Sequence, residues 1–183
     1  MMTDETLLRN AKRLSVHRSP YRGVVYRSST PQFSKAGDIL SGSGSARFGG
    51  RFNPAGLSAV YASETPETAI SETLAHFRYY GFDIASAMPR LFTAIDVALQ
   101  LVLDLTDSAI RRKLGISRAL LLECDWRRWS PGTELPASQR LGYAAFLAGF
   151  EAVLATSAVA LNGRNLVVFP QNRLKGSAIA IRS

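Results

Sequence analysis

The chain has 183 residues, of which 46% are hydrophobic, so it is long enough for one domain with a substantial core. It has no apolar run of the roughly 18 to 20 residues that a membrane helix needs, and its N-terminal segment lacks the apolar centre of a signal peptide, so we expect a cytoplasmic protein without membrane contact. The single cysteine, Cys124, excludes an internal disulfide and a cysteine-based zinc site, and we expect its thiol to be buried.

The net charge of +8 is unevenly distributed along the chain. Residues 1–35 are strongly basic, and no acidic residue follows Glu151. This charge suits an anionic partner such as a nucleotide, a nucleic acid or an acidic protein. A basic face that only meets solvent would carry the same charge. The sequence contains no helix-turn-helix pattern, RNP motif or zinc finger, so charge alone does not indicate a nucleic-acid-binding module.

In the first half of the chain, short elements flank a long glycine-rich connection. The connection covers residues 28–56 and is longer than most, which is typical of functional or disordered loops. Its aromatic residues argue against disorder. The predicted elements around it are a helix at 3–15, a strand at 23–27, a strand at 59–62 and a helix that begins at Thr65 and Pro66.

The helix that follows Thr65 carries the acidic residue of most interest. Ile70, Leu74 and Phe77 form its apolar stripe, which we expect to face the core. Glu72 lies off that stripe among small neighbours, which leaves space around its carboxylate as a ligand would require. The ordinary alternative for a helical glutamate is exposure to solvent.

The second half predicts mostly strands without a regular β-α-β order. Its elements are strands at 91–97 and 101–105, a helix from Thr106 to Leu114, a packed loop at 118–136 containing Pro131, a helix at 138–148, and strands at 152–154, 165–169 and 178–181. This order favours an α+β fold with central mixed or antiparallel sheets flanked by helices. We expect one domain over residues 1–183, in which 1–20 form an N-terminal helical extension.

The stretch from Ser41 to Glu72 combines glycines with two arginines, Arg47 and Arg51. Backbone N–H groups and guanidinium groups can therefore approach one ligand closely, which favours a pocket for a phosphorylated, sugar-bearing ligand. A glycine-rich surface turn with solvated arginines is the plain alternative. The glycines concerned are Gly42, Gly44, Gly49, Gly50 and Gly56.

This stretch matches neither a P-loop nor a dinucleotide-binding fingerprint, because it lacks the Gly-Lys-Ser/Thr ending and the third glycine. The two histidines, His17 and His76, lack the paired spacing of metal ligands, so we expect no metal site.

Several blocks of the sequence resemble the RES-domain family, the toxin halves of bacterial RES/Xre toxin–antitoxin pairs. The resemblance runs in order from Tyr26 to about Arg173. It is carried by Tyr26-Arg27, by Ser41–Pro54 with its RFGGRFNP run, by Val60-Tyr61-Ala62, by Glu72, and by later matches at 104–106, 139–142, Ser157 and 165–170.

The resemblance implies a compact fold similar to ADP-ribosyltransferase toxins and an enzyme that cleaves the nicotinamide–ribose bond of NAD. The ADP-ribosyl group would pass to phosphate, to water or to a protein. NAD would be a substrate, with inorganic phosphate as a candidate co-substrate, and no cofactor or metal would be held permanently. The implied partner is an Xre, helix-turn-helix antitoxin that forms a tight inhibitory complex, so that DNA contact occurs only through the antitoxin.

The resemblance also implies the site residues. The catalytic positions are Arg27, Tyr61 and Glu72. Glu72 would stabilise the positive charge that develops on the ribose, and Tyr61 would contact the nicotinamide side. The binding positions are Arg47, Gly49, Gly50, Arg51, Asn53, Ser157 and Asn165, among which Arg51 would join Arg27 in binding the pyrophosphate or an attacking phosphate.

Two positions depart from the family pattern: Phe52 stands where tryptophan is common, and the segment 170–172 lacks a histidine that often follows the proline. Two other readings stay open. One is a protein ADP-ribosyltransferase that uses the same pocket. The other is a basic binding module without catalysis.

Overall fold

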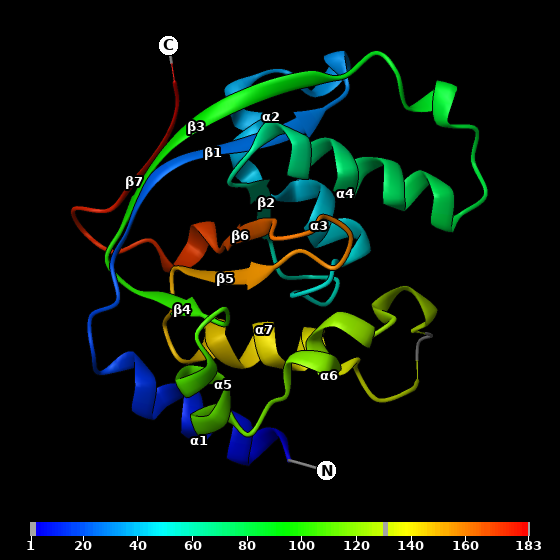
Figure 1. The fold of residues 1–183 in the computed structure, drawn as a ribbon. Helices are drawn as coiled ribbons and strands as arrows, with labels where there is room; N and C mark the ends of the chain where they lie inside the picture. The colour runs from blue at the N-terminus through cyan, green and yellow to red at the C-terminus, as the bar shows by residue number, and fades with distance from the viewer. Residues whose placement is uncertain (1–2, 130–131, 183) are drawn as a thin grey trace.

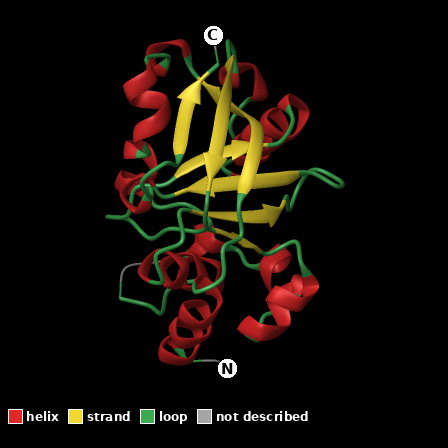
Figure 2. Cartoon of the chain, turned by 90° about the vertical axis from the view of Figure 1, so that its left-hand side faces the viewer, coloured by secondary structure: helices red, strands yellow, loops and turns green. Residues whose placement is uncertain are grey.

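The computed structural model describes residues 3–129 and 132–182, in which a seven-stranded mixed sheet has the strand order β4-β5-β6-β2-β1-β3-β7 (Figures 1 and 2). β4 pairs with β5 in parallel, and the other neighbouring strands pair antiparallel. The predicted α+β fold with a mixed sheet is therefore confirmed. The strands are β1 (Tyr21–Ser29), β2 (Val60–Ser63), β3 (Leu91–Leu99), β4 (Val102–Asp104), β5 (Ala152–Thr156), β6 (Arg164–Val168) and β7 (Ala178–Ile181).

Helices pack against the β4 end of this sheet and against its central strands (Figure 1). One group, formed by α1, α5, α6 and α7, lies beside β4 and β5, and α4 lies beside β1 and β2. The helices are α1 (Asp4–Ser15), α2 (Ala36–Ser41), α3 (Ser43–Phe48), α4 (Pro66–Tyr79), α5 (Ser108–Leu114), α6 (Arg118–Glu123) and α7 (Ala137–Leu147). Short 3-10 turns occur at Pro31–Phe33, Ile84–Ala87, Trp126–Arg128 and Pro170–Asn172. No helix within the described residues is long and apolar enough to cross a membrane.

β5 and β6 are buried on both faces over most of their length, which explains why they read as continuous apolar runs. In β6, Leu166 packs into a cluster with Val25 and Ile95, whereas Val167 faces the opposite cluster with Leu141. The helix α1 belongs to that second cluster, because Leu7 and Ala11 are buried against α7. The N-terminal helix is therefore packed into the core, although residues 1 and 2 lie outside the described part.

The long connection predicted at 28–56 is more regular than expected. It contains a 3-10 turn and the helices α2 and α3, which are separated by Gly42 in the left-handed region at φ +67°. A methyl group at Gly42 would also lie 2.7 Å from the backbone nitrogen of Ala59, so glycine is needed there for both conformation and space. The segment predicted as a packed loop at 118–136 likewise begins with α6, and its Pro131 lies outside the described residues.

The start of α4 is confirmed, but its buried face differs from the prediction. The Thr65 side chain accepts a hydrogen bond from the backbone N–H of Thr68, and Pro66 occupies the first turn. The most buried residues are Thr68 and Ala69, whereas the predicted apolar stripe is only half-buried. Small side chains let the first turns approach β2 closely, and the same face continues to Glu72.

Candidate active site

A cavity of about 680 Å³ opens between α4, the loop after α3, the central strands and the segment that follows α6. This volume lies within the usual range of small-molecule sites and suffices for a ligand of nucleotide size. Seven of the predicted site residues line it: Arg27, Gly49, Gly50, Arg51, Tyr61, Glu72 and Asn165. Segments that are far apart in the sequence thus meet at one cavity.

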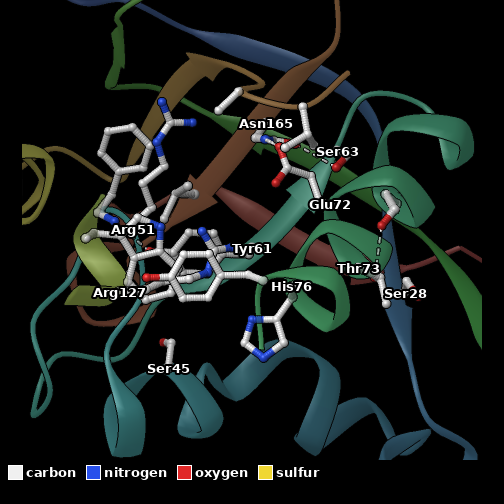
Figure 3. A pocket seen from close by; sticks show the side chains of 18 of the residues that line it. Ser28, Ser45, Arg51, Tyr61, Ser63, Glu72, Thr73, His76, Arg127 and Asn165 are labelled. Carbon is white, nitrogen blue, oxygen red and sulfur yellow. Dashed lines mark hydrogen bonds between the residues drawn. The ribbon is translucent and has the colours of Figure 1, made fainter. Parts of the chain in front are cut away.

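The Glu72 carboxylate is held in place by two neutral donors (Figure 3). Its Oε1 accepts hydrogen bonds from the hydroxyl of Ser157 at 2.7 Å and from the Nδ2 of Asn165 at 2.6 Å. Both hydrogen bonds that Glu72 accepts from the described residues thus end on Oε1. Oε2 is left for a ligand.

The two donors are themselves oriented by their neighbours. The Ser157 oxygen accepts hydrogen bonds from the backbone N–H groups of Val159 and Ala160, at 3.1 and 2.8 Å, so its own proton is directed at Glu72. The Ser63 hydroxyl donates to Oδ1 of Asn165 at 2.7 Å and so orients the amide with Nδ2 toward the carboxylate. The result is a pre-formed network that holds one carboxylate oxygen at the cavity wall.

Ser63 is a member of this network that the sequence analysis missed. It follows Tyr61 by two positions on β2, and alternate residues of a strand face the same side of the sheet. That spacing was the available signal, since Tyr61 was already a predicted site residue.

Arg27 reaches the cavity from β1. One terminal nitrogen donates to the backbone oxygen of Tyr61 at 2.8 Å, while its Nε is buried without a hydrogen-bond partner. Burial, and then the nearby charge of Arg90, lower the pKa of Arg27. An arginine nevertheless keeps its charge at neutral pH, so Arg27 is a partly desolvated cation at this wall.

Arg51 is tied to the backbone at both ends of its guanidinium group. One terminal nitrogen donates to the carbonyl of Thr156 at 3.2 Å, and the other donates to the carbonyl of Leu121 at 2.5 Å. The guanidinium carbon also lies 5.1 Å from the ring centre of Phe52. Burial lowers the pKa of Arg51, and the charge of Glu72 opposes that change. Arg51 thus joins α6 to β5 beside the cavity.

The Tyr61 hydroxyl is already committed to the loop that precedes it. It donates to Oδ1 of Asn53 at 2.7 Å and accepts from the backbone N–H of Phe52 at 2.8 Å. Burial raises the pKa of Tyr61, so the phenol stays neutral. A methyl group at Gly50 would lie 2.6 Å from this hydroxyl, which gives Gly50 a packing role besides its place in the cavity wall. The ring of Tyr61, rather than its hydroxyl, is therefore the part offered to a ligand.

Three predicted binding residues do not line the cavity. Arg47 is exposed, with its guanidinium carbon 5.0 Å from the ring centre of Phe48. Asn53 is fully buried, and its amide donates to the backbone carbonyls of Ser45, Pro54 and Leu57. Ser157 is buried and acts through its bond to Glu72.

The segment after α6 contributes a wall that the sequence analysis did not assign. Cys124 and Arg127 line the cavity there, and His76 and Arg90 add to it from other elements. Cys124 was expected to be buried but is half-buried, and its Sγ accepts a hydrogen bond from the Ser138 hydroxyl at 3.4 Å. Burial, followed by the charges of Arg127 and Arg90, lowers the pKa of His76. In the described ranges, His, Cys, Asp and Glu side chains form no group of three that could hold a metal ion.

Comparison with known proteins relates the chain to a family and to a solved structure. The crystal structure of the M. tuberculosis MbcT–MbcA toxin–antitoxin complex contains a similar fold, with a TM-score of 0.75 and 23% sequence identity over 98% of this chain and 90% of that chain. None of the curated proteins matches the chain. The sequence model of the RES domain matches residues 18–182, almost the whole length. The chain therefore belongs to the RES domain family.

Proposed function

We propose that this protein is the toxin of a toxin–antitoxin pair and that its cavity cleaves the nicotinamide–ribose bond of NAD, passing the ADP-ribosyl group to phosphate or water. The observation that carries the proposal is the fixed carboxylate of Glu72 in a cavity of nucleotide size. Membership of the RES domain family and the likeness to a protein solved in a toxin–antitoxin complex support it.

Cleavage of the nicotinamide–ribose bond requires a site that stabilises positive charge on the ribose. The bond between the ribose C1′ and the nicotinamide nitrogen breaks with its electron pair going to the nitrogen, so the cationic nicotinamide leaves as a neutral molecule. It needs no proton from the enzyme. Positive charge develops on the ribose instead, and a pre-oriented carboxylate stabilises it without reorganising. Glu72 meets this need, because two donors hold Oε1 while Oε2 can face the ribose.

The second half of the reaction forms a new bond from C1′ to an oxygen nucleophile. With phosphate the product is ADP-ribose 1″-phosphate, and with water it is ADP-ribose plus a proton released to solvent. Arg27, which keeps a buried Nε without a partner, is placed to bind an anion in the cavity. A protein acceptor would make the enzyme an ADP-ribosyltransferase that uses the same cavity.

We further propose an antitoxin of the Xre type that covers the cavity in the cell, with any DNA contact made through it. The related structure was solved as a toxin–antitoxin complex, and the net charge of +8 suits an acidic inhibitory segment. A toxin that depletes NAD would require such an inhibitor in its own host.

The test is to incubate the purified protein with NAD, with and without inorganic phosphate, and to quantify free nicotinamide and the ADP-ribosyl product. We expect release that falls on the order of 10²- to 10³-fold in Glu72→Gln. The glutamine oxygen can still accept the bonds from Ser157 and Asn165, so this variant should fold.

Glu67→Gln is the matched control, because Glu67 lies on the same helix but is exposed in its first turn. It should keep wild-type activity. Equal nicotinamide release from wild type and Glu72→Gln would refute the proposal. Label transfer from NAD to a protein band, without a small-molecule product, would replace it by protein ADP-ribosylation.

A further inference from the structure

We propose that Arg127, on the segment after α6, is the residue that recognises phosphoryl oxygens at the end of the cavity away from Glu72. Figure 3 shows Arg51 and Arg127 at one end of the cavity, with Glu72, Asn165 and Ser63 at the other. The ligand class is a diphosphate such as that of an adenine dinucleotide. The assignment of the diphosphate to an adenine dinucleotide rests on the proposed function. The assignment of an anion-binding site rests on the geometry alone.

Unlike those of Arg51, the side-chain donors of Arg127 have no hydrogen-bond partner in the part of the chain that the structure describes. Arg51 spends both terminal nitrogens on the carbonyls of Thr156 and Leu121. Arg127 makes no side-chain hydrogen bond or ion pair with the described residues, and its Nε is buried without a partner. An unpaired buried donor is costly, and a bound anion would remove that cost.

Two aromatic rings hold Arg127 in place without using its donors. Its guanidinium carbon lies 4.5 Å from the ring centre of Trp126 and 5.0 Å from that of Tyr79, which belongs to α4. The Tyr79 hydroxyl donates to Asp125 at 3.1 Å and so connects α4 to the same segment. The guanidinium group is therefore positioned by its faces while its N–H edges stay available.

The charges around Arg127 are not balanced by carboxylates. Arg51 and His76 both feel its positive charge, since it contributes to lowering the pKa of each. Among the acidic residues of the cavity wall, Glu72 is held by Ser157 and Asn165, and Asp125 pairs with Arg128. The remaining one, Glu123, is exposed and forms no ion pair with Arg127. Four arginines and three carboxylates line the cavity, and Arg127 forms no ion pair with a carboxylate among the described residues, which favours an anionic ligand at this end.

Phosphoryl oxygens fit this site better than a single carboxylate. A guanidinium group binds them through two parallel N–H donors, and a diphosphate offers oxygens to Arg27 and Arg127 on the same cavity. A diphosphate of NAD or a free phosphate ion could supply this chemistry. If the ligand is the diphosphate of NAD, its adenosine part should add to the binding affinity, whereas a free phosphate ion has no such part.

The test is equilibrium binding by calorimetry with the full chain, using ADP, adenosine and inorganic phosphate as separate probes. We expect ADP to bind more tightly than adenosine, and Arg127→Met to weaken ADP binding on the order of tenfold to 100-fold. Arg128→Met is the matched control, because the side chain of the adjacent Arg128 is 82% exposed, pairs with Asp125 and does not line the cavity. It should bind ADP like the wild type. Circular dichroism and thermal unfolding of each variant show that it folds.

The outcomes separate this proposal from the proposed function. Equal ADP affinity of the wild type and Arg127→Met, or no preference for ADP over adenosine, overturns it whether or not NAD is cleaved. Loss of phosphate binding with unchanged ADP binding identifies a free anion and overturns the diphosphate assignment. Loss of ADP binding in Arg127→Met supports the site even if nicotinamide is never released.

Discussion

The two ends of the cavity are built in opposite ways. At one end, Glu72 accepts hydrogen bonds from Ser157 and Asn165, which are themselves oriented by further bonds. At the other, the Arg127 side chain has aromatic contacts but no hydrogen-bonded partner among the described residues. The carboxylate of Glu72 is therefore held in place without a ligand, whereas the guanidinium group of Arg127 still lacks hydrogen-bond acceptors among the described residues.

This difference shows how one small domain can separate two tasks. A group that stabilises a developing charge should not move during the reaction, so it is worth fixing in advance. A group that binds a ligand anion gains most when its donors have no competing partner in the free protein. Arg51 fits the second task less well than Arg127, because two of its five N–H donors already join α6 to β5.

Removing a hydrogen bond from the network around Glu72 should have the largest effect on activity. In Asn165→Ala, Glu72 loses one donor and Ser63 loses its partner, so we expect kcat for nicotinamide release to fall about 10- to 100-fold with little change in KM. Asn165→Asp keeps the oxygen that accepts from Ser63 but turns a carboxylate toward Glu72, and it should be less active still. Steady-state kinetics with NAD would measure both. Wild-type activity in Asn165→Asp would show that the donated bond is not needed.

Substituting Arg51 and Arg127, at the end of the cavity away from Glu72, should change the free energy of unfolding by different amounts. Arg51→Met removes two bonds to backbone carbonyls, so we expect the free energy of unfolding to fall by about 1–3 kcal/mol. Arg127→Met removes ring contacts alone and should cost less than about 1 kcal/mol. Urea unfolding without ligand measures both values. A larger loss in Arg127→Met than in Arg51→Met would reverse the assignment of the two residues.

The smallest expected effect concerns His76 and pH. Burial, with the charges of Arg127 and Arg90, lowers the pKa of His76 in the folded protein from the ordinary value of 6.5, so the unfolded chain binds its proton more readily. Stability should therefore decrease as the pH falls below about 6.5, and this part of the decrease should be absent in His76→Gln. The effect is small because His76 is exposed to solvent.

Thermal unfolding of the wild type and His76→Gln at about pH 7.5 and about pH 5.5 tests this linkage. Bound ADP should reduce the difference, because a diphosphate would offset the neighbouring positive charges. Identical pH dependence of the two proteins would mean that neither burial nor the arginines lower the pKa of His76.

Much of the fold could be predicted because its signals are local. Thr65 and Pro66 mark the start of α4 within one turn, and the apolar runs of β5 and β6 reflect burial on both faces. The buried face of α4 could not be predicted in the same way. Apolar periodicity selected Ile70, Leu74 and Phe77, whereas close packing against the sheet selected the small residues Thr68 and Ala69.

The candidate site was likewise predictable in its residues but not in their positions. The sequence by itself determined which residues are chemically suited to the cavity, because Arg27, Tyr61, Glu72 and Asn165 stand in a recognisable order of short blocks. It assigned the pyrophosphate to Arg51 but also kept Arg47, four residues earlier and chemically alike, among the binding residues. Only the tertiary structure decided that the chain after Gly49 and Gly50 brings Arg51 to the cavity and leaves Arg47 outside.

Arg127 shows the same limit most clearly. Its environment comes from Trp126 beside it and from Tyr79, which lies on a separate helix. Hydrogen-bond partners, desolvation and neighbouring charges depend on distances in space, and no periodicity along the chain encodes them. The sequence therefore determined the chemical groups, and the packing of α4 against the segment after α6 decided which of their donors remain free.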